Sequence, residues 1–227
     1  MTFRCAELSL ERDEPLMATA PVTSRWELVE RAKPWGRDHG LVAEGAKVLL
    51  VRRIGTSEPQ AADGRHYLVC TNGARDPCCA IRGPAVAQVL ERARPGQVYE
   101  CSHLGGHRFA ANVLVLPDGL CFGRLDARSA PALADELDAG TLPLEHLRGR
   151  TAFEPEQQAA EILVRRELGL AGLAALTLVE ATTFTLPDGR GVTAVVRGNT
   201  LQPHRVSCRD EKVEAAVRWE LEELVLA

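Results

Sequence analysis

Two cysteines and two histidines stand in two short, glycine-containing segments of the 227-residue sequence. Cys70 and Cys79 enclose eight residues in CTNGARDPCC, and His103 and His107 enclose three in HLGGH. Glycines let the backbone approach a bulky group closely and turn both imidazoles to the same side. Thiolate and imidazole suit zinc, or iron in a sulfide cluster. Because the cysteine segment is long enough to wrap a large group, we predict a metal centre with these four ligands and favour the cluster.

Strands and helices in alternation are expected to position these segments. HYLVCTNG (66–73) predicts a short strand, PAVAQVLERARPG (84–96) a helix that starts at its proline, and QVYECSHLGGHRF (97–109) a strand that runs into the glycine loop. ANVLVLPDGLCFGRL (111–125) predicts two strands joined by a Pro-Asp-Gly turn, and SAPALADELDAG (129–140) a closing helix. This is the order of the thioredoxin fold, so we predict an α/β core in which helices flank a mixed sheet.

Three regions follow from this pattern. We expect residues 1–64 to form an N-terminal extension that packs on the core, with AKVLLVRRI (46–54) as a buried strand. Residues 65–150 make up the thioredoxin-like core. Residues 151–227 predict a smaller α+β region that begins with the helix EPEQQAAEILVRRELG and continues with a β-hairpin around PDGRG. We assign no role to this last region, because its sequence holds no recognisable chemistry.

Composition limits the class of protein. The formal net charge of −4 argues against nucleic acid as a partner, and a hydrophobic share of 45% supports a substantial core. No apolar run is long enough to cross a bilayer, and the first residues are too charged for a signal peptide. Seven cysteines without a secretory signal favour thiol, metal or redox chemistry over a disulfide framework. We therefore expect a cytoplasmic protein without a membrane partner.

Several stretches resemble the sucrase/ferredoxin-like family of thioredoxin-like [2Fe–2S] proteins. These are CAELSLERDEPLMATAP and PWGRD near the start, CTNGARDPCCAIRGP, and CSHLGGHRFAANVLVLPDGLCFGRL, which together span most of residues 5–150. The resemblance implies a thioredoxin-like ferredoxin domain with one [2Fe–2S] cluster. His103 and His107 match the spacing of the two histidines in the bis-histidinyl members of the family. Cys70 and Cys79 match the first ligand pair, while Cys78, directly beside Cys79, is the alternative second ligand.

The ligand set implied by the resemblance is that of an electron carrier rather than an enzyme, although an enzymatic role stays open. Two neutral imidazoles in place of two thiolates remove negative charge, so the cluster should be reduced more readily than in plant-type ferredoxins. A ring nitrogen that does not bind iron can titrate, and the potential should therefore depend on pH. The name sucrase gains no support from the residues, because no carboxylate pair can be assigned to glycoside hydrolysis.

Two other functions are compatible with the same residues. A zinc-stabilised Cys2His2 interaction module would use the same four ligands, but its cysteines are usually separated by two to four residues. A thioredoxin-like thiol oxidoreductase would use Cys70 or Cys79, but the sequence contains no C-x-x-C pair. A Rieske centre is rejected, because Cys101 and His103 form one half of its signature and the C-x-x-H half is absent from the chain.

The remaining polar candidates receive weaker roles. We expect Cys5, Cys121 and Cys208 to be packing residues, and Cys208 to share no metal with His204. Three arginines, Arg75, Arg82 and Arg108, lie within or beside the ligand segments, where they could dock a redox partner protein with an acidic surface or form structural salt bridges. A salt-dependent electron-transfer rate would indicate docking. The oligomeric state is not predicted.

Overall fold

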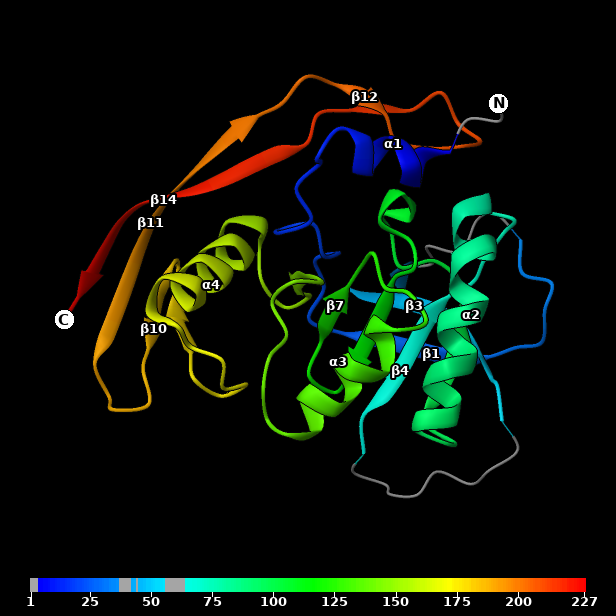
Figure 1. The fold of residues 1–227 in the computed structure, drawn as a ribbon, viewed down its shortest axis with the longest axis horizontal. Coiled ribbons are helices and arrows are strands. Elements are labelled where there is room, and N and C mark those ends of the chain that lie inside the picture. Colours follow the sequence, from blue (N-terminus) through cyan, green and yellow to red (C-terminus); the bar gives the residue numbers. More distant parts are fainter. Residues whose placement is uncertain (1–3, 37–41, 44, 56–63) are drawn as a thin grey trace.

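A mixed sheet forms the centre of the molecule in the computed structural model, which describes residues 4–36, 42–43, 45–55 and 64–227 (Figure 1). Eight strands of the described chain belong to this sheet. Their order is β1 (Trp26–Glu30), β3 (Ala46–Arg53), β5 (Val98–Cys101), β4 (His66–Cys70), β6 (Val113–Leu116), β7 (Leu120–Phe122) and β8 (Leu147–Arg150), and β2 (Val42–Ala43) pairs with β3.

The middle of the sheet has the predicted thioredoxin arrangement. β4 leads through α2 (Pro77–Ala93) to β5, which lies parallel to β4. β6 then pairs antiparallel with β4 on its other side, β7 pairs antiparallel with β6, and α3 (Ser129–Asp138) follows. The predicted α/β class with flanking helices is thereby confirmed.

The N-terminal region extends this sheet. β1 lies parallel to β3, and β3 pairs antiparallel with β5, so strands from residues 26–53 are continuous with the core. The short helix α1 (Cys5–Glu11) lies against the 3-10 turn η1 (His107–Phe109). The extension therefore contributes to the sheet as well as covering the glycine loop.

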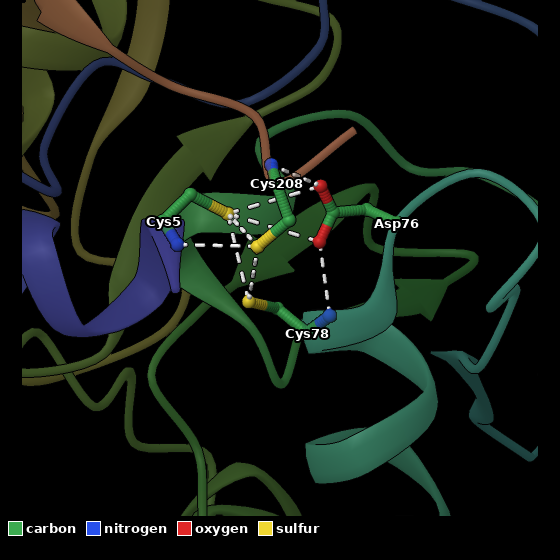
Figure 2. A group of neighbouring side chains, drawn as sticks. All are labelled: Cys5, Asp76, Cys78 and Cys208. Carbon is green, nitrogen blue, oxygen red and sulfur yellow. Dashed lines mark hydrogen bonds between the residues drawn. The ribbon is translucent and has the colours of Figure 1, made fainter. Parts of the chain in front are cut away.

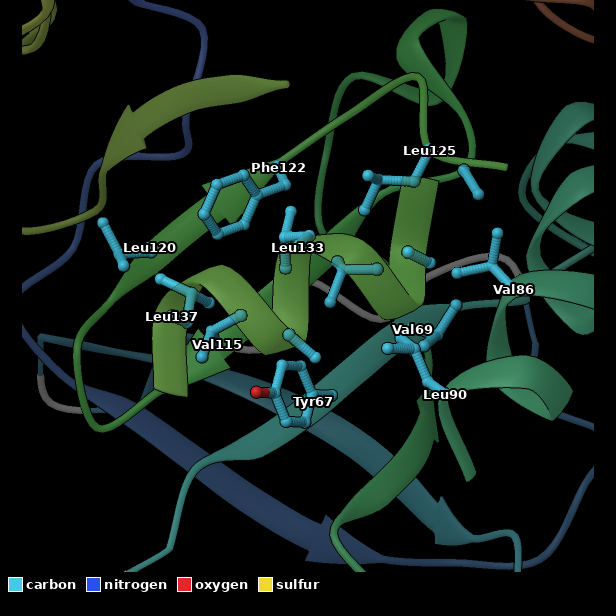
Figure 3. Close-up of a cluster of buried hydrophobic side chains, with 14 of the residues drawn as sticks. Tyr67, Val69, Val86, Leu90, Val115, Leu120, Phe122, Leu125, Leu133 and Leu137 are labelled. Carbon is cyan, nitrogen blue, oxygen red and sulfur yellow. The ribbon is translucent and has the colours of Figure 1, made fainter. Parts of the chain in front are cut away.

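Alternation along β4 sorts its side chains onto two faces. Tyr67 and Val69 pack with Val86 and Leu90 of α2 and with α3 in the main hydrophobic cluster (Figure 3). Leu68 and Cys70 point to the opposite face, because successive strand residues alternate, and Leu68 and Cys70 belong to a second buried cluster that also holds α1. Cys70 therefore reaches the end of the sheet on the face that α1 covers.

Helix α2 begins at Pro77, not at Pro84 as predicted. The Asp76 side chain caps it by accepting a hydrogen bond of 2.9 Å from the backbone N–H of Cys78, and Pro77 occupies the first turn, where a missing N–H costs nothing. Pro84 lies inside the helix, which continues past it to Ala93. As a result, Cys78 and Cys79 lie in the first turn of a helix and not in a loop.

The C-terminal region forms a second, smaller body of structure. As predicted, α4 (Pro155–Leu168) ends at Gly169, and a hairpin follows. The antiparallel sheet has the order β14 (Val217–Leu226), β11 (Gly191–Thr200), β10 (Thr183–Thr185) and β9 (Thr177–Glu180). Between β11 and β14, the pair β12 (His204–Arg205) and β13 (Val213–Glu214) passes over α1 (Figure 1). None of the described helices has the length and apolar character needed to span a membrane.

Candidate metal centre

The two predicted cysteine ligands meet where β4 ends and α2 begins. Cys70 is the last residue of β4 and Cys79 lies in the first turn of α2, and each is only 1% exposed. Both thiols belong to one buried cluster, and Cys79 is the group that lowers the pKa of the Cys70 thiol most. The cap at Asp76 holds this first turn in place, so the close approach of the two thiols is set by how the helix begins.

The two predicted histidine ligands lie on the loop after β5. Gly105 and Gly106 both have positive φ, +78° and +64°, which glycine adopts without strain. The imidazole rings of His103 and His107 stand with their centroids 5.8 Å apart and their planes inclined by 32°. Both rings therefore lie close to each other on the loop, as the HLGGH pattern predicts.

The histidine loop lies next to the thiol of Cys70. Sγ of Cys70 donates to the carbonyl oxygen of Ser102 at 3.2 Å, one residue before His103, and His103 and the backbone N–H of Leu104 both lower the pKa of this thiol. In the described part of the chain, Nδ1 of His103 and both ring nitrogens of His107 are buried without a hydrogen-bond partner. Buried polar atoms without partners are rare, because they lose their hydration without compensation. Metal ligation would supply the missing partner, and this donor set fits an iron–sulfur cluster.

The donor atoms of the four predicted ligands are not the closest group of metal-ligating atoms in the described part of the chain. Among the described residues, the ligand atoms of three or more His, Cys, Asp or Glu residues lie within 4.8 Å of one another in one group, and that group contains neither histidine. Ligand atoms around a single zinc ion must all lie about that close, since zinc–ligand bonds are about 2.0–2.3 Å long. Among the described residues, no three of the four predicted ligands form such a close group.

The protonation of Cys70 and His107 suits metal binding, whereas Cys79 would release a proton when it binds. The hydrogen bond from Cys79 lowers the pKa of the Cys70 thiol well below its usual range, against the effect of burial and with the help of His103. The same contact, together with burial, raises the pKa of the Cys79 thiol. Burial lowers the pKa of His107, although the Asp76 carboxylate opposes it. A thiolate and a neutral imidazole are the forms that bind metal.

Arg148 on β8 is a buried cation that the sequence did not reveal. Its guanidinium donates to the carbonyl oxygen of Gly105 and to Oδ1 of Asn112, both at 3.0 Å, while Nδ2 of Asn112 donates to Gly106 at 3.0 Å. Burial lowers the pKa of Arg148, and the thiols of Cys70 and Cys79 are among the groups that raise it. Arg148 therefore holds the histidine loop and places positive charge near the ligand cysteines. No local pattern distinguishes it from the other arginines.

The arginines expected to dock a partner are partly engaged inside the molecule. Arg108 forms ion pairs with Glu14 at 2.6 Å and with Glu214 at 3.3 Å, so it joins the glycine loop to the N- and C-terminal regions. Arg75 lies 3.8 Å from Asp210. Arg108 thus has the structural role that the sequence left open, and docking of an acidic partner stays a prediction.

A second group of thiols was missed by sequence reasoning. Cys5, Cys78 and Cys208 meet around Asp76, and their ligand atoms all lie within 4.8 Å of one another (Figure 2). Two of these cysteines were expected only to pack. His204 is not part of this group, because its Nε2 contacts Glu14 at 3.2 Å. Cys101 and Cys121 are fully buried in the core, as expected for Cys101 on its strand.

The close packing of α2 on β4 can be tested at Gly83. A Cβ atom there would overlap the carbonyl oxygen of Cys70 and approach Cγ2 of Thr71 at 2.9 Å. We expect Gly83→Ala to lower the free energy of unfolding by about 2 kcal/mol, because overpacking outweighs the better helix propensity of alanine. Urea unfolding followed by circular dichroism measures this. Ala85→Gly on the exposed side of α2 is the control and should cost about 1 kcal/mol; a more stable Gly83→Ala would contradict the tight contact.

Comparison with known proteins gives the family. The structure of a thioredoxin-like [2Fe–2S] ferredoxin from Aquifex aeolicus is 22% identical over 38% of this chain and 91% of its own, with a TM-score of 0.32. Two cysteine-to-serine variants of that ferredoxin are 18% and 16% identical, each over 37% of this chain and 97% of its own, also with TM-scores of 0.32. No curated protein matches significantly. The profile of the sucrase/ferredoxin-like family matches residues 16–149, more than half of the sequence. The chain belongs to the sucrase/ferredoxin-like family.

Proposed function

We propose that the protein is an electron carrier that holds one [2Fe–2S] cluster through Cys70, Cys79, His103 and His107. The observation that supports this most strongly is the burial of three ring nitrogens, Nδ1 of His103 and Nδ1 and Nε2 of His107, without a hydrogen bond in the described part of the chain, beside the buried thiols of Cys70 and Cys79. When bound, a [2Fe–2S] cluster accepts and returns one electron.

The ligand residues set the charge of the site. Two thiolates and two neutral imidazoles leave an oxidised cluster without net charge, whereas four thiolates leave it with two negative charges. Arg148 adds a buried positive charge on the histidine side, and the backbone N–H of Leu104 lowers the pKa of the Cys70 thiol. Each of these features favours addition of an electron, because it lowers the negative charge that builds up on reduction. We therefore propose a potential above that of plant-type ferredoxins.

The histidines also supply a place for a proton. Each imidazole has two ring nitrogens, and iron would bind one of them. In His107, Nε2 lies 3.5 Å from Oδ2 of Asp76, a carboxylate that favours a proton on this ring. Electron uptake would favour it further, so we propose that electron and proton uptake are coupled at this site.

Burial argues against the thiol oxidoreductase. Such an enzyme attacks its substrate with a thiolate that solvent and substrate can reach. Six of the seven cysteines are buried, Cys70 and Cys79 among them. These two buried thiols can bind a metal cluster, but the disulfide of a substrate protein cannot reach them. Electron transfer is therefore the function that the site supports best.

Anaerobic purification of the full chain tests this proposal. We expect a coloured protein with about two iron atoms and two acid-labile sulfides per chain, and a rhombic or axial electron paramagnetic resonance signal after reduction by one electron. Iron and sulfide assays together with the visible spectrum measure this. A colourless sample that lacks both iron and sulfide would overturn the proposal, whatever other metal it contains.

A further inference from the structure

Three thiols from distant parts of the chain meet beside the N-terminus of α2 (Figure 2). Cys5 begins α1, Cys78 lies in the first turn of α2, and Cys208 follows β12. Their sulfurs form a nearly equilateral triangle: Cys5 lies 3.5 Å from Cys78, Cys78 lies 3.4 Å from Cys208, and Cys208 lies 3.5 Å from Cys5. The Asp76 carboxylate closes the group, with Oδ1 3.7 Å and Oδ2 3.9 Å from the sulfur of Cys5.

We propose that Cys5, Cys78, Cys208 and Asp76 bind one zinc ion, at a site that shares no ligand with the [2Fe–2S] site and adjoins it through Asp76, whose Oδ2 lies 3.5 Å from Nε2 of His107. A tetrahedral zinc ion with bonds of about 2.3 Å to sulfur places its sulfur ligands about 3.8 Å apart. The three sulfur–sulfur distances are within a few tenths of an ångström of this value. A disulfide requires a separation of about 2.05 Å. The spacing is thus that of metal ligands and not of a covalent pair.

The surroundings of the four side chains are those of a closed structural site. Asp76 is fully buried, Cys5 and Cys78 are nearly so, and Cys208 is partly exposed, which leaves a route for the ion to enter. The sulfur of Cys208 accepts a hydrogen bond of 3.2 Å from the N–H of Cys5, and the backbone N–H of Ala6 is among the groups that lower the pKa of the Cys78 thiol. Such outer contacts orient metal ligands and offset thiolate charge.

The carboxylate is oriented in the same way. Oδ1 of Asp76 accepts from the N–H of Cys78, and Oδ2 accepts from the N–H of Cys208, both at 2.9 Å. These bonds fix the carboxylate toward the three sulfurs. Oδ2 also accepts from Oγ of Ser207 at 3.4 Å, so Oδ1, which lies 3.7 Å from the sulfur of Cys5, is the oxygen with a lone pair for a metal. Three thiolates and one carboxylate are a donor set that zinc takes with tetrahedral geometry.

Adjacent residues of α2 serve the two sites. Cys79 faces Cys70, whereas Cys78 faces Cys5 and Cys208. Neighbouring helix residues point about 100° apart, since a turn contains 3.6 residues, so one helix start can supply a ligand to each site. Cys5 and Cys208 both lie outside residues 16–149, the part that the family profile matches. The zinc proposal therefore does not depend on the cluster.

Zinc at this position would join three regions of the chain. Cys5 and Cys208 are 203 residues apart in sequence, and Cys78 and Cys208 are 130 apart. An ion that binds the folded form alone stabilises it, and closing such long loops restricts the unfolded chain. The ion would hold the β12–β13 segment over α1 and against the start of the ligand helix. The ion pairs of Arg108 with Glu14 and Glu214 connect the same three regions.

Metal analysis of the full chain, purified without a metal-affinity step, tests the proposal directly. We expect about one zinc per chain by mass spectrometry, in addition to any iron. Zinc K-edge absorption should show about three sulfur ligands near 2.3 Å and one oxygen ligand near 2.0 Å. Zinc content at the level of the buffer, or a mass that shows a disulfide between Cys5 and Cys208, would overturn the proposal.

Three matched substitutions locate the ion. Cys5→Ala and Cys208→Ala should each lower the zinc-to-iron ratio at least about tenfold. Each substitution removes one of the four zinc ligands, and a structural zinc site with only three ligands binds its ion weakly. Cys121→Ala removes an equally buried thiol outside the site and should keep the ratio of the unaltered chain. Full zinc in Cys208→Ala would contradict the assignment. Iron and zinc are assayed in the same samples. Missing zinc would therefore contradict the zinc site, and missing iron would contradict the cluster, independently of each other.

Discussion

Replacing Cys79 with alanine should leave the chain almost without iron and sulfide, whereas replacing Cys78 should leave both in place. The two residues are adjacent, lie in the same helical turn and are 1% and 2% exposed, so each variant is a close control for the other. Cys79 interacts with Cys70, the other thiol of the proposed cluster site. Cys78 points instead toward Cys5 and Cys208. Loss of a thiolate that binds iron removes one of four ligands and exposes the cluster to breakdown.

Iron and acid-labile sulfide assays on anaerobically prepared protein measure this difference, and the visible spectrum gives an independent check. For Cys79→Ala we expect iron and sulfide to fall at least about tenfold, with the visible absorption bleached. For Cys78→Ala we expect the iron content of the unaltered chain and the loss of zinc. The reverse pattern would make Cys78 the cluster ligand and would contradict the interpretation of the helix start. Circular dichroism of both variants shows whether each is folded.

Local sequence signals were sufficient for most of the fold. The glycine loop between His103 and His107, the turn after β6 and the end of α4 at Gly169 each depend on residues close together in the chain, and each occurs where the sequence predicts it. The start of α2 was predicted wrongly, because Pro77 and Pro84 both suit the first turn of a helix. The structure shows that the cap at Asp76 decides between them.

The second thiol group could not be predicted, because it depends on tertiary structure alone. Cys5 and Cys208 contact each other across 203 residues, and neither lies in a motif of metal ligands. Arg148 was missed for a similar reason, since its burial depends on the packing of β8 against the glycine loop. Spacing within a short segment predicts ligands that share a loop. Ligands that come from the two ends of a chain can be recognised only when the folded structure is known.

The second large effect concerns the reduction potential. Replacing His103 or His107 with cysteine exchanges a neutral ligand for an anionic one, so the potential should fall by on the order of 100 mV, toward the value of about −400 mV of plant-type ferredoxins. Redox titration followed by the visible spectrum measures the change. His146→Cys is the control: this half-buried histidine contacts the carbonyl oxygen of Gly123 at 3.2 Å, outside the proposed ligand set, and its replacement should leave the potential unchanged.

The pH dependence of the potential follows from the same two histidines. Burial lowers the pKa of the unliganded His107 ring, which favours the neutral form that binds iron. The proton that can then exchange is the one on the ring nitrogen that iron leaves free. An added electron raises the pKa of a liganded imidazole, because negative charge favours its protonated form. Between these two pKa values a proton accompanies each electron, and the potential falls by about 59 mV for each unit of rising pH. A single histidine-to-cysteine variant retains one such ring, and the double variant retains none and should lose the slope. A potential that stays constant from about pH 5 to about pH 10 in the unaltered chain would show that no imidazole of the site exchanges a proton on reduction.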